Sequence, residues 1–313
     1  MTSRRELLRS AAGLGLTASV VPLCGRASPS DSVRPLALDY VRMDIGLEHP
    51  FSILHISDTH LTAVYPHETV RRRKTAAERS AVFGGQQEAA IRASLDWAAK
   101  NDELVVHTGD LIDFQTEANL DLVRGIFGGK VRILGTVGNH ESWGERDDDP
   151  PDGSAELRVI NARALSAAYP FDLEFSNAIV NGVNFVLLDD SDGTVGESQV
   201  ERFSAEVKKG LPIVLCLHVP IFTDWIFRAT VRHWRFRNRK FRNDRVSPFG
   251  DSKRQMEDRT TAEFIRYLKS ERLLKGILAG HEHVSMSDSF SDTAMQYVVG
   301  GNYSFHATEI LLF

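Results

Sequence analysis

The sequence contains only two cysteines among 313 residues, Cys24 and Cys216. We expect Cys24 to be removed with an N-terminal leader and Cys216 to lie alone in a strand, so no framework of disulfide bonds is implied. Internal repeats and low-complexity segments are absent from the sequence. The formal net charge is only -5, so overall charge indicates neither a nucleic-acid nor a membrane partner. With 42% hydrophobic and 25% charged residues, the composition is that of an ordinary soluble globular protein.

The apolar run between Ala11 and Leu23 is too short to span a bilayer. It follows an Arg4-Arg5 pair and precedes a small-residue cleavage site, an order that resembles a bacterial twin-arginine export signal. We therefore expect residues 1–27 to be a signal peptide read by the twin-arginine export machinery and residues 28–35 to be a polar tether. The mature protein would be periplasmic or secreted, without stable membrane insertion. The alternatives are an accidental arginine pair on a frayed helix, or a lipoprotein anchored through Cys24, which Leu23 disfavours.

The mature chain, residues 36–313, reads as one domain. Strands alternate with helices in its first half, and strand pairs follow later, which predicts a layered α/β sandwich. A basic stretch from His67 to Lys74 reads as a loop, and residues 221–256 form a basic, aromatic insertion. The predicted strands are 36–45, 51–57, 173–180, 183–189, 212–218 and short strands within 284–313; the predicted helices are 81–100, 155–168, 198–208 and 257–271.

Five apolar runs each end at side chains that can bind metals. The run Glu103–Thr108, for example, stops at a glycine and then offers Asp110. Because buried strands of an α/β sheet deliver such residues to the carboxyl edge, we expect the five ends to converge. The residues at these ends are Asp58, His60, Asp110, Asn139, His140, His218, His281 and His283.

Without His140, this set offers imidazole nitrogen, carboxylate oxygen and one amide oxygen, but no sulfur. Such a mixture suits Mn, Fe, Zn or Ni, and it suits neither a closed zinc-thiolate site nor calcium. Seven ligands are too many for one ion. A carboxylate can bridge two ions, so sharing Asp110 would give each ion four protein ligands and leave room for water.

In order and spacing, these motifs resemble the signature of the calcineurin-like metallophosphoesterases over about residues 52–284. The resemblance implies a four-layer αββα sandwich of two mixed β-sheets flanked by helices. It also implies a metal-dependent phosphoesterase with two divalent or mixed-valence transition metal ions. The matching motifs are Asp58-Thr59-His60, Gly109-Asp110, Gly138-Asn139-His140-Glu141, His218 and Gly280-His281-Glu282-His283.

The same resemblance implies a role for each residue of the site. One metal would be held by Asp58, His60, Asp110 and His283, and the other by Asp110, Asn139, His218 and His281. A metal-activated hydroxide would attack phosphorus, and His140 would donate a proton to the leaving group. Glu141, as a carboxylate beside that imidazole, would fix its tautomer and raise its pKa.

Several of these histidines also have a plainer interpretation. His140 could be an ordinary core or surface histidine beside a ligand. His55 and His107 lie within predicted strands, where a hydrogen-bonded core imidazole is the better interpretation. His306 and Asp113 are not assigned a role.

The resemblance narrows the substrate only partly. Ser/Thr phosphatases continue the second motif as G-D-x-x-D-R-G, whereas here Phe114 follows Asp113, so the phosphate-binding arginine of that motif is missing. Purple acid phosphatases place a tyrosine ligand at the position of Asp113. What remains is an exported dinuclear hydrolase of phosphate mono- or diesters. The alternatives are a nuclease or cyclic-nucleotide phosphodiesterase, or a non-catalytic binding module on the same fold.

Two basic stretches follow motif-bearing strands, Arg71-Arg72-Arg73-Lys74 and the insertion after His218. Loops at such strand ends line active sites. We expect them to form a cationic, partly aromatic rim for a small anionic phosphoester, with nucleic acid as a possible but unsupported partner. The plainer alternative is a solvated face with an aromatic mini-core that holds the insertion in place.

Overall fold

The computed structural model describes residues 34–143, 155–237 and 258–313, except the side chains of residues 155 and 235–237. The predicted signal peptide, most of the tether and the second half of the insertion lie outside these residues. Residues 34–313 form one compact unit. None of the helices described within it has the length and apolar character needed to cross a membrane.

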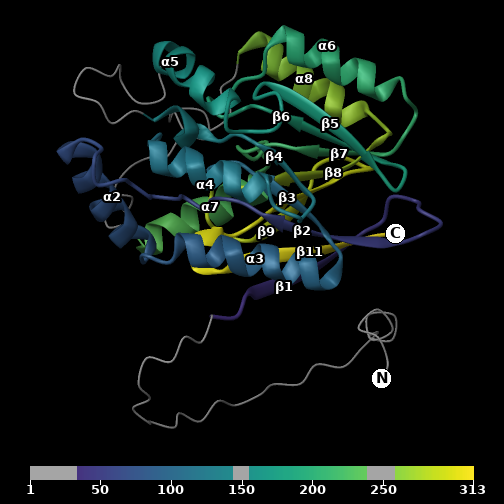
Figure 1. The fold of residues 1–313 in the computed structure, drawn as a ribbon. Helices are drawn as coiled ribbons and strands as arrows, with labels where there is room; N and C mark the ends of the chain where they lie inside the picture. The colour runs from purple at the N-terminus through teal and green to yellow at the C-terminus, as the bar shows by residue number, and fades with distance from the viewer. Residues whose placement is uncertain (1–33, 144–154, 238–257) are drawn as a thin grey trace, which may run out of the picture. The chain divides into compact units, whose positions relative to one another are not determined.

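The first sheet has five strands in the order β1-β11-β2-β3-β4 (Figure 1). β11 is parallel to β1 and antiparallel to β2, while β2, β3 and β4 run parallel to one another. The sheet therefore aligns the carboxyl ends of the three strands that precede the first three motifs. The strands are β1 (Ala37–Met43), β11 (His306–Leu312), β2 (Phe51–Ile56), β3 (Leu104–Thr108) and β4 (Ile133–Thr136).

The second sheet has six strands in the order β5-β6-β7-β8-β10-β9. β6, β7 and β8 are parallel, and the last two motifs follow the carboxyl ends of β7 and β8. β5 and β6 form the predicted hairpin, with Asn181 and Gly182 at positive φ (49° and 82°) as a two-residue turn requires. The strands are β5 (Phe175–Val180), β6 (Val183–Leu188), β7 (Ile213–Cys216), β8 (Leu274–Ala279), β10 (Met295–Val298) and β9 (Met286–Ser289).

Three apolar clusters separate four layers. Alternate residues of one strand point to opposite faces, so Leu54 of β2 packs against helices while Ile53 packs against the second sheet. In β6, Val186 faces the helices on the other side and Phe185 faces the first sheet. The central strands of both sheets are thus buried on both faces, and the predicted αββα sandwich is confirmed.

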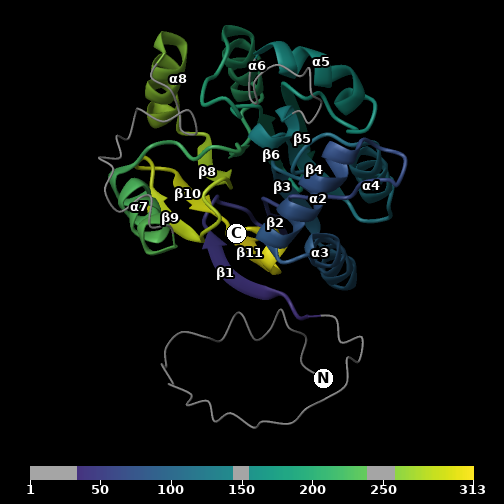
Figure 2. The same cartoon turned by 90° about the vertical axis from the view of Figure 1, so that its left-hand side faces the viewer.

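The helices divide between the two outer layers. α3, α4 and α5 contribute to the cluster outside the first sheet, and α6 and α8 to the cluster outside the second. α2 and α7 both lie on the face turned toward the viewer in Figure 2. The helices are α2 (Val70–Phe83), α3 (Gln87–Asn101), α4 (Glu117–Phe127), α5 (Ala155–Ser166), α6 (Glu197–Val207), α7 (Asp224–Arg237) and α8 (Arg259–Ser270).

Helix α2 corrects the sequence-based prediction. The stretch 67–74 was expected to be a loop, but its second half is helical from Val70, and the Thr69 side chain accepts a hydrogen bond from the Arg72 amide as an N-cap. The predicted helix 81–100 is two helices, because Gly84 ends α2 with φ 86°. Only Ala76 and Phe83 of α2 are buried, so the helix lacks the apolar periodicity that would have revealed it.

Candidate metal centre

The candidate ligands lie in tight turns directly after the strands. Eight non-glycine residues in the described part of the chain have positive φ, and five of them are candidate ligands. This backbone conformation is uncommon for non-glycine residues and persists where the surroundings enforce it, often at functional sites. The turns therefore hold an unfavourable backbone conformation that directs these side chains toward one site. The five are Asp58, His60, Asp110, His281 and His283.

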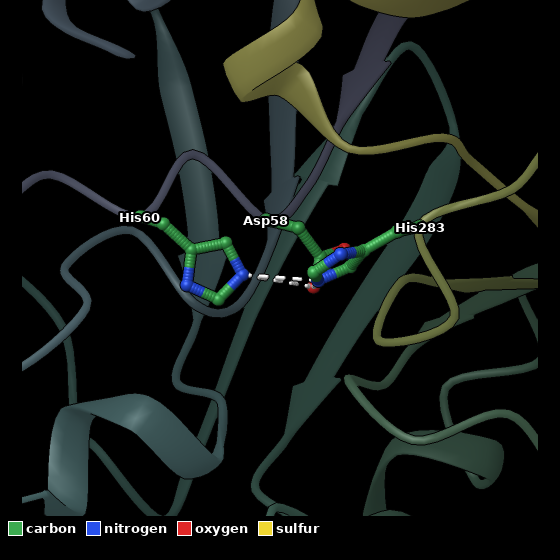
Figure 3. Close-up of side chains that lie close together, drawn as sticks. All are labelled: Asp58, His60 and His283. Atoms are coloured by element: carbon green, nitrogen blue, oxygen red, sulfur yellow. Dashed lines mark hydrogen bonds and ion pairs between the residues drawn. The ribbon is translucent and has the colours of Figure 1, made fainter. Parts of the chain in front are cut away.

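Asp58, His60 and His283 form a first group of ligand atoms (Figure 3). Nε2 of His60 lies 3.0 Å from Nε2 of His283. Oδ1 of Asp58 lies 3.8 Å from the same atom of His60 and 3.3 Å from Nε2 of His283. Three donors from two sheets thus face one point.

Asp110, His218 and His281 form a second group. Nε2 of His218 lies 3.3 Å from Oδ2 of Asp110, 3.2 Å from Nδ1 of His281 and 3.2 Å from Oδ1 of Asn139. Oδ2 of Asp110 also lies 3.7 Å from Nε2 of His60, which belongs to the first group. The Asp110 carboxylate is therefore positioned between the two groups.

The separation of these donors suits cations. Ligands at about 2.1 Å from one ion stand roughly 3.0–3.5 Å apart in octahedral or tetrahedral geometry. The Nδ1 atoms of His60 and His218 face a carboxylate oxygen of Asp113 (3.0 Å) and the carbonyl oxygen of Thr108 (2.8 Å). Both partners accept hydrogen bonds, so each Nδ1 carries a proton and each Nε2 faces the site.

The electrostatics of the site point the same way. Burial opposes ionisation of Asp58 and Asp110, but nearby imidazoles outweigh it and hold both pKa values below the usual range. Burial lowers the pKa of His60 to about 4, so its ring is neutral. Burial also acts to lower the pKa of His218, but the Asp110 carboxylate outweighs it and raises this pKa to about 10. The buried carboxylates of Asp58 and Asp110 are ionised, and buried negative charges require a compensating positive charge. The donor set fits divalent metal ions.

Asp113, which the sequence left unassigned, lies directly behind two imidazoles of the site. Its buried carboxylate oxygen Oδ1 is 3.0 Å from Nδ1 of His60 and 2.9 Å from Nδ1 of His140. The main-chain oxygen of Asp113 is also 2.9 Å from Nδ1 of His140. Arg79 donates to both carboxylate oxygens. The position of Asp113 three residues after Asp110, in the G-D-x-x-D pattern, was the sequence signal that could have identified it.

The position of Glu141 differs from the expectation. Its carboxylate was expected beside the His140 ring, but it accepts hydrogen bonds from the main-chain amides of Gly138 (2.8 Å), Asp110 (3.2 Å) and Leu111 (2.8 Å), and from the Tyr169 hydroxyl (2.9 Å). The carboxylate that contacts the imidazole belongs to Asp113. Glu141 therefore joins the turn after β3 to the turn after β4.

Glu141→Ala is expected to reduce the free energy of unfolding by about 3 kcal/mol or more, because it leaves several buried amides without an acceptor. Tyr169→Phe removes a single hydrogen bond to the same carboxylate and should cost about 1 kcal/mol. Urea unfolding of the two variants measures both values. Equal losses would contradict the role of Glu141 as the common acceptor of the two turns.

Glycines allow these turns to approach each other. A Cβ atom on Gly109 would lie 2.6 Å from Nδ1 of His218 and 2.8 Å from the main-chain nitrogen of Gly138. Gly109 also has φ 93°, a conformation that other residues rarely adopt. The glycine in the second motif is therefore required by packing against a ligand of the other sheet.

The insertion reaches the site through its described part. Trp234 of α7 donates from Nε1 to Glu282 (3.3 Å), and its ring lies 5.9 Å from that of His283. Arg228 and Arg232 of the same helix are exposed. The arginines of residues 239–245 lie outside the described residues, so the rim stays a prediction.

His55 and His107 are the core imidazoles that the sequence favoured. Both are buried, and their Nε2 atoms pair with the hydroxyls of Thr108 and Thr59 at 2.9 Å each. Burial lowers the pKa of His55 to about 3 and of His107 to about 4. His306 lies apart from both ligand groups and pairs with Asp39 on β1 at 3.1 Å.

We expect the buried imidazoles of His55 and His107 to destabilise the metal-free protein as the pH falls from about 6.5 to about 4. In the unfolded chain these imidazoles take up protons near pH 6.5, whereas in the folded protein His55 and His107 resist protonation down to about pH 3 and 4. At these two sites the unfolded state then binds more protons, so their contribution disfavours the folded state as the pH falls. Burial raises the pKa of the Glu141 and Asp190 carboxyls to about 7, and these groups act in the opposite direction. Urea unfolding across this range measures the slope, and His107→Gln should lose less stability on acidification than the wild-type protein. An unchanged slope in that variant would contradict the assignment.

Comparisons with known proteins extend the geometric result. A family model described as calcineurin-like phosphoesterase matches residues 51–285, about three quarters of the chain. No curated protein matches the sequence. Among solved structures, a dimetal phosphatase from Danio rerio is 16% identical, with a TM-score of 0.48, and covers 81% of this chain and 88% of its own.

Two 5′-nucleotidases also match. A putative one from Staphylococcus aureus is 12% identical, with a TM-score of 0.40 over 81% of this chain, and one from Candida albicans is 13% identical, with a TM-score of 0.38 over 86%. The match covers about half of their length, 49% and 47%. All three TM-scores lie below 0.5, so the assignment to a family rests on the family model.

Proposed function

Because the chain belongs to the calcineurin-like phosphoesterase family and is a metal-dependent phosphoesterase, we propose that it is exported and hydrolyses phosphate mono- or diesters at two metal ions. The observation that supports this most is the Asp110 carboxylate between two groups of ligand atoms. The donor chemistry suits Mn, Fe, Zn or Ni, divalent or of mixed valence. The proposed ligands are Asp58, His60, Asp110 and His283 for one ion, and Asp110, Asn139, His218 and His281 for the other.

When bound, a pair of such ions clamps a phosphoryl group, activates water and stabilises charge on the attacking and leaving oxygens. The protein's part is to orient the ligand imidazoles. The Asp113 carboxylate and the Thr108 carbonyl oxygen keep Nε2 of His60 and His218 available. Main-chain amides hold the carboxylates, since His140 donates from its amide to Asp110 (2.9 Å) and His281 donates to Asp58 (2.9 Å).

His140 is proposed to donate a proton to the leaving oxygen. Burial acts to lower its pKa, but the carboxylates of Asp110 and Asp113 outweigh burial and raise it. Bound cations would lower the pKa of His140. Asp113 accepts from Nδ1, so the Nε2 atom of the ring is left to deliver the proton. Glu141 acts on His140 only indirectly, because its carboxylate holds the turns after β3 and β4 together through their main-chain amides.

A reconstitution experiment tests the function. Purified mature protein is stripped with a chelator, reloaded separately with Mn, Zn, Fe or Ni, and assayed on bis-p-nitrophenyl phosphate and p-nitrophenyl phosphate. Hydrolysis that returns with metal supports the proposal, and the ratio of the two rates reports the diester or monoester preference. No hydrolysis with any metal would favour the binding module.

The proposed substrate is a small anionic phosphoester that contacts the basic and aromatic rim. Mutation of Arg71, Arg72, Arg235 and Arg237 to alanine should raise KM for a charged ester, and an unchanged KM would remove the rim from the proposal. DNA binding with a steep dependence on salt would instead support the nuclease alternative. A screen of cyclic nucleotides tests the phosphodiesterase alternative.

The export proposal rests on the sequence of residues 1–27 and places the mature protein in the periplasm or outside the cell. Replacing Arg4 and Arg5 together by lysine should keep the protein in the cytoplasm if the twin-arginine machinery reads this segment. Cell fractionation of a bacterial host that expresses the full chain measures the outcome. Export that persists in the double variant would contradict the proposal.

A further inference from the structure

Helix α2 contacts the site through one of its faces. Arg79 and Phe83 are four residues apart, so both side chains lie on the same side of the helix. The Phe83 ring stacks on that of His60, with centroids 4.3 Å apart and an interplanar angle of 9°. Tyr303 packs against Phe83 from another direction, at 4.8 Å. The helix thus restricts the imidazole of a proposed metal ligand by contact with its flat face.

Arg79 restrains the same imidazole through a carboxylate. Its Nε donates to Oδ2 of Asp113 at 2.5 Å and its Nη2 donates to Oδ1 at 2.7 Å, a two-pronged geometry that fixes the plane of the carboxylate. The guanidinium lies over Phe83 (5.0 Å) and Trp143 (5.4 Å). Its side chain is 28% exposed, whereas that of Asp113 is fully buried. Arg79 is thus the cation that accompanies this carboxylate into the interior.

Asp113 has two imidazoles to orient with one oxygen. Oδ1 faces Nδ1 of both His60 and His140, so a small rotation of the carboxylate would lengthen one contact or the other.

From these contacts we propose that Arg79 is a positioning residue for the hydrolysis proposed above. It holds Asp113 where one oxygen accepts from both His60 and His140, while Phe83 supports the face of the His60 ring. Helix α2 therefore sets the direction of one ligand imidazole and of the proposed proton donor together. The expected effect of Arg79 on hydrolysis rests on the proposed function, whereas its effect on the orientation of the imidazoles does not.

Arg79→Ala should lower kcat by about 10–100-fold, in the range found for partners of metal-binding histidines, and change KM by less than about twofold. Guanidinium chloride, far below the concentrations that unfold the protein, should restore part of the lost rate. Arg79→Lys keeps the charge but not the planar guanidinium, so its kcat should fall between those of the wild-type protein and Arg79→Ala. The matched control is Arg202→Ala in α6, because Arg202 likewise pairs with a carboxylate, that of Asp172, and lies over a phenylalanine ring.

Proton NMR of the zinc-loaded protein provides the readout that does not depend on activity. The Nδ1 proton of His60, which faces the Asp113 carboxylate, should lose its protection from exchange in Arg79→Ala. The Nδ1 protons of His140 and His218 should keep more of theirs, because the main-chain oxygens of Asp113 and Thr108 accept from them. The proposal is wrong if the His60 proton stays protected and kcat falls no further than in Arg202→Ala. If the wild-type protein shows no hydrolysis with any metal, the proposed function fails, and the NMR comparison still decides the role of Arg79. If Arg79→Ala does not fold, Arg79→Lys provides the same comparison.

Discussion

Asp110→Asn is expected to lower kcat for bis-p-nitrophenyl phosphate by about 10³-fold or more and to leave fewer than two metal ions bound per chain. Oδ2 of Asp110 lies between the two ligand groups, 3.3 Å from His218 and 3.7 Å from His60. Replacing this oxygen or its charge removes the only proposed ligand shared by both ions. Metal ions contribute several kcal/mol of charge stabilisation in such reactions, and each 1.4 kcal/mol corresponds to a tenfold change in rate.

Asp39→Asn is the matched control, because Asp39 also pairs with a histidine, His306, at 3.1 Å, but outside the ligand groups. It should leave the metal content and the rate unchanged. Mass spectrometry of the metals and steady-state kinetics measure the two properties in both variants. If Asp110→Asn kept two metal ions and wild-type activity, the dinuclear proposal would be wrong.

His140→Asn should slow hydrolysis by about 10²–10⁴-fold for an alkyl phosphate ester, whose leaving alkoxide requires a proton. For a p-nitrophenyl ester the loss should be much smaller, because p-nitrophenolate leaves without protonation. The imidazole is held for this purpose by Asp113, with both a carboxylate and a main-chain oxygen 2.9 Å from Nδ1. The ratio of the two losses therefore separates proton donation from positioning.

The matched control for His140 is His107→Gln, a change of another buried imidazole, which lies outside the ligand groups. It should affect both esters alike and only through stability. Kinetics with a series of esters of graded leaving-group pKa give the dependence directly. Equal losses for all esters in His140→Asn would show that this histidine is not the proton donor.

The sequence carried much of this description because its motifs are local. A run such as Leu104–Thr108 followed by Gly109-Asp110 is recognisable without any knowledge of what it packs against. The alternation of helices and strands restricted the architecture to a layered α/β sandwich, and five motifs in order indicated both the family and the identity of the candidate ligands. Core imidazoles such as His55 could also be separated from the ligands by their place within a strand.

The structure was needed wherever two residues far apart in the chain determine each other's role. Glu141 is adjacent to His140 in sequence, but the turn sends its carboxylate to main-chain amides, and Asp113 contacts the imidazole instead. Arg79 belongs to none of the motifs, and α2 has only two buried residues, Ala76 and Phe83, so no apolar periodicity indicated that it packs against the site.

The sequence by itself therefore determined the chemical identity of the donors, the order of the strands that carry them and the family. Only the tertiary structure decided which carboxylate orients which imidazole, and that Arg79, between the predicted loop 67–74 and the predicted helix 81–100, lies on helix α2 and contacts the site. The physical reason is that ligand type depends on the residue alone, whereas orientation depends on hydrogen bonds and ring contacts between segments that are distant in the chain.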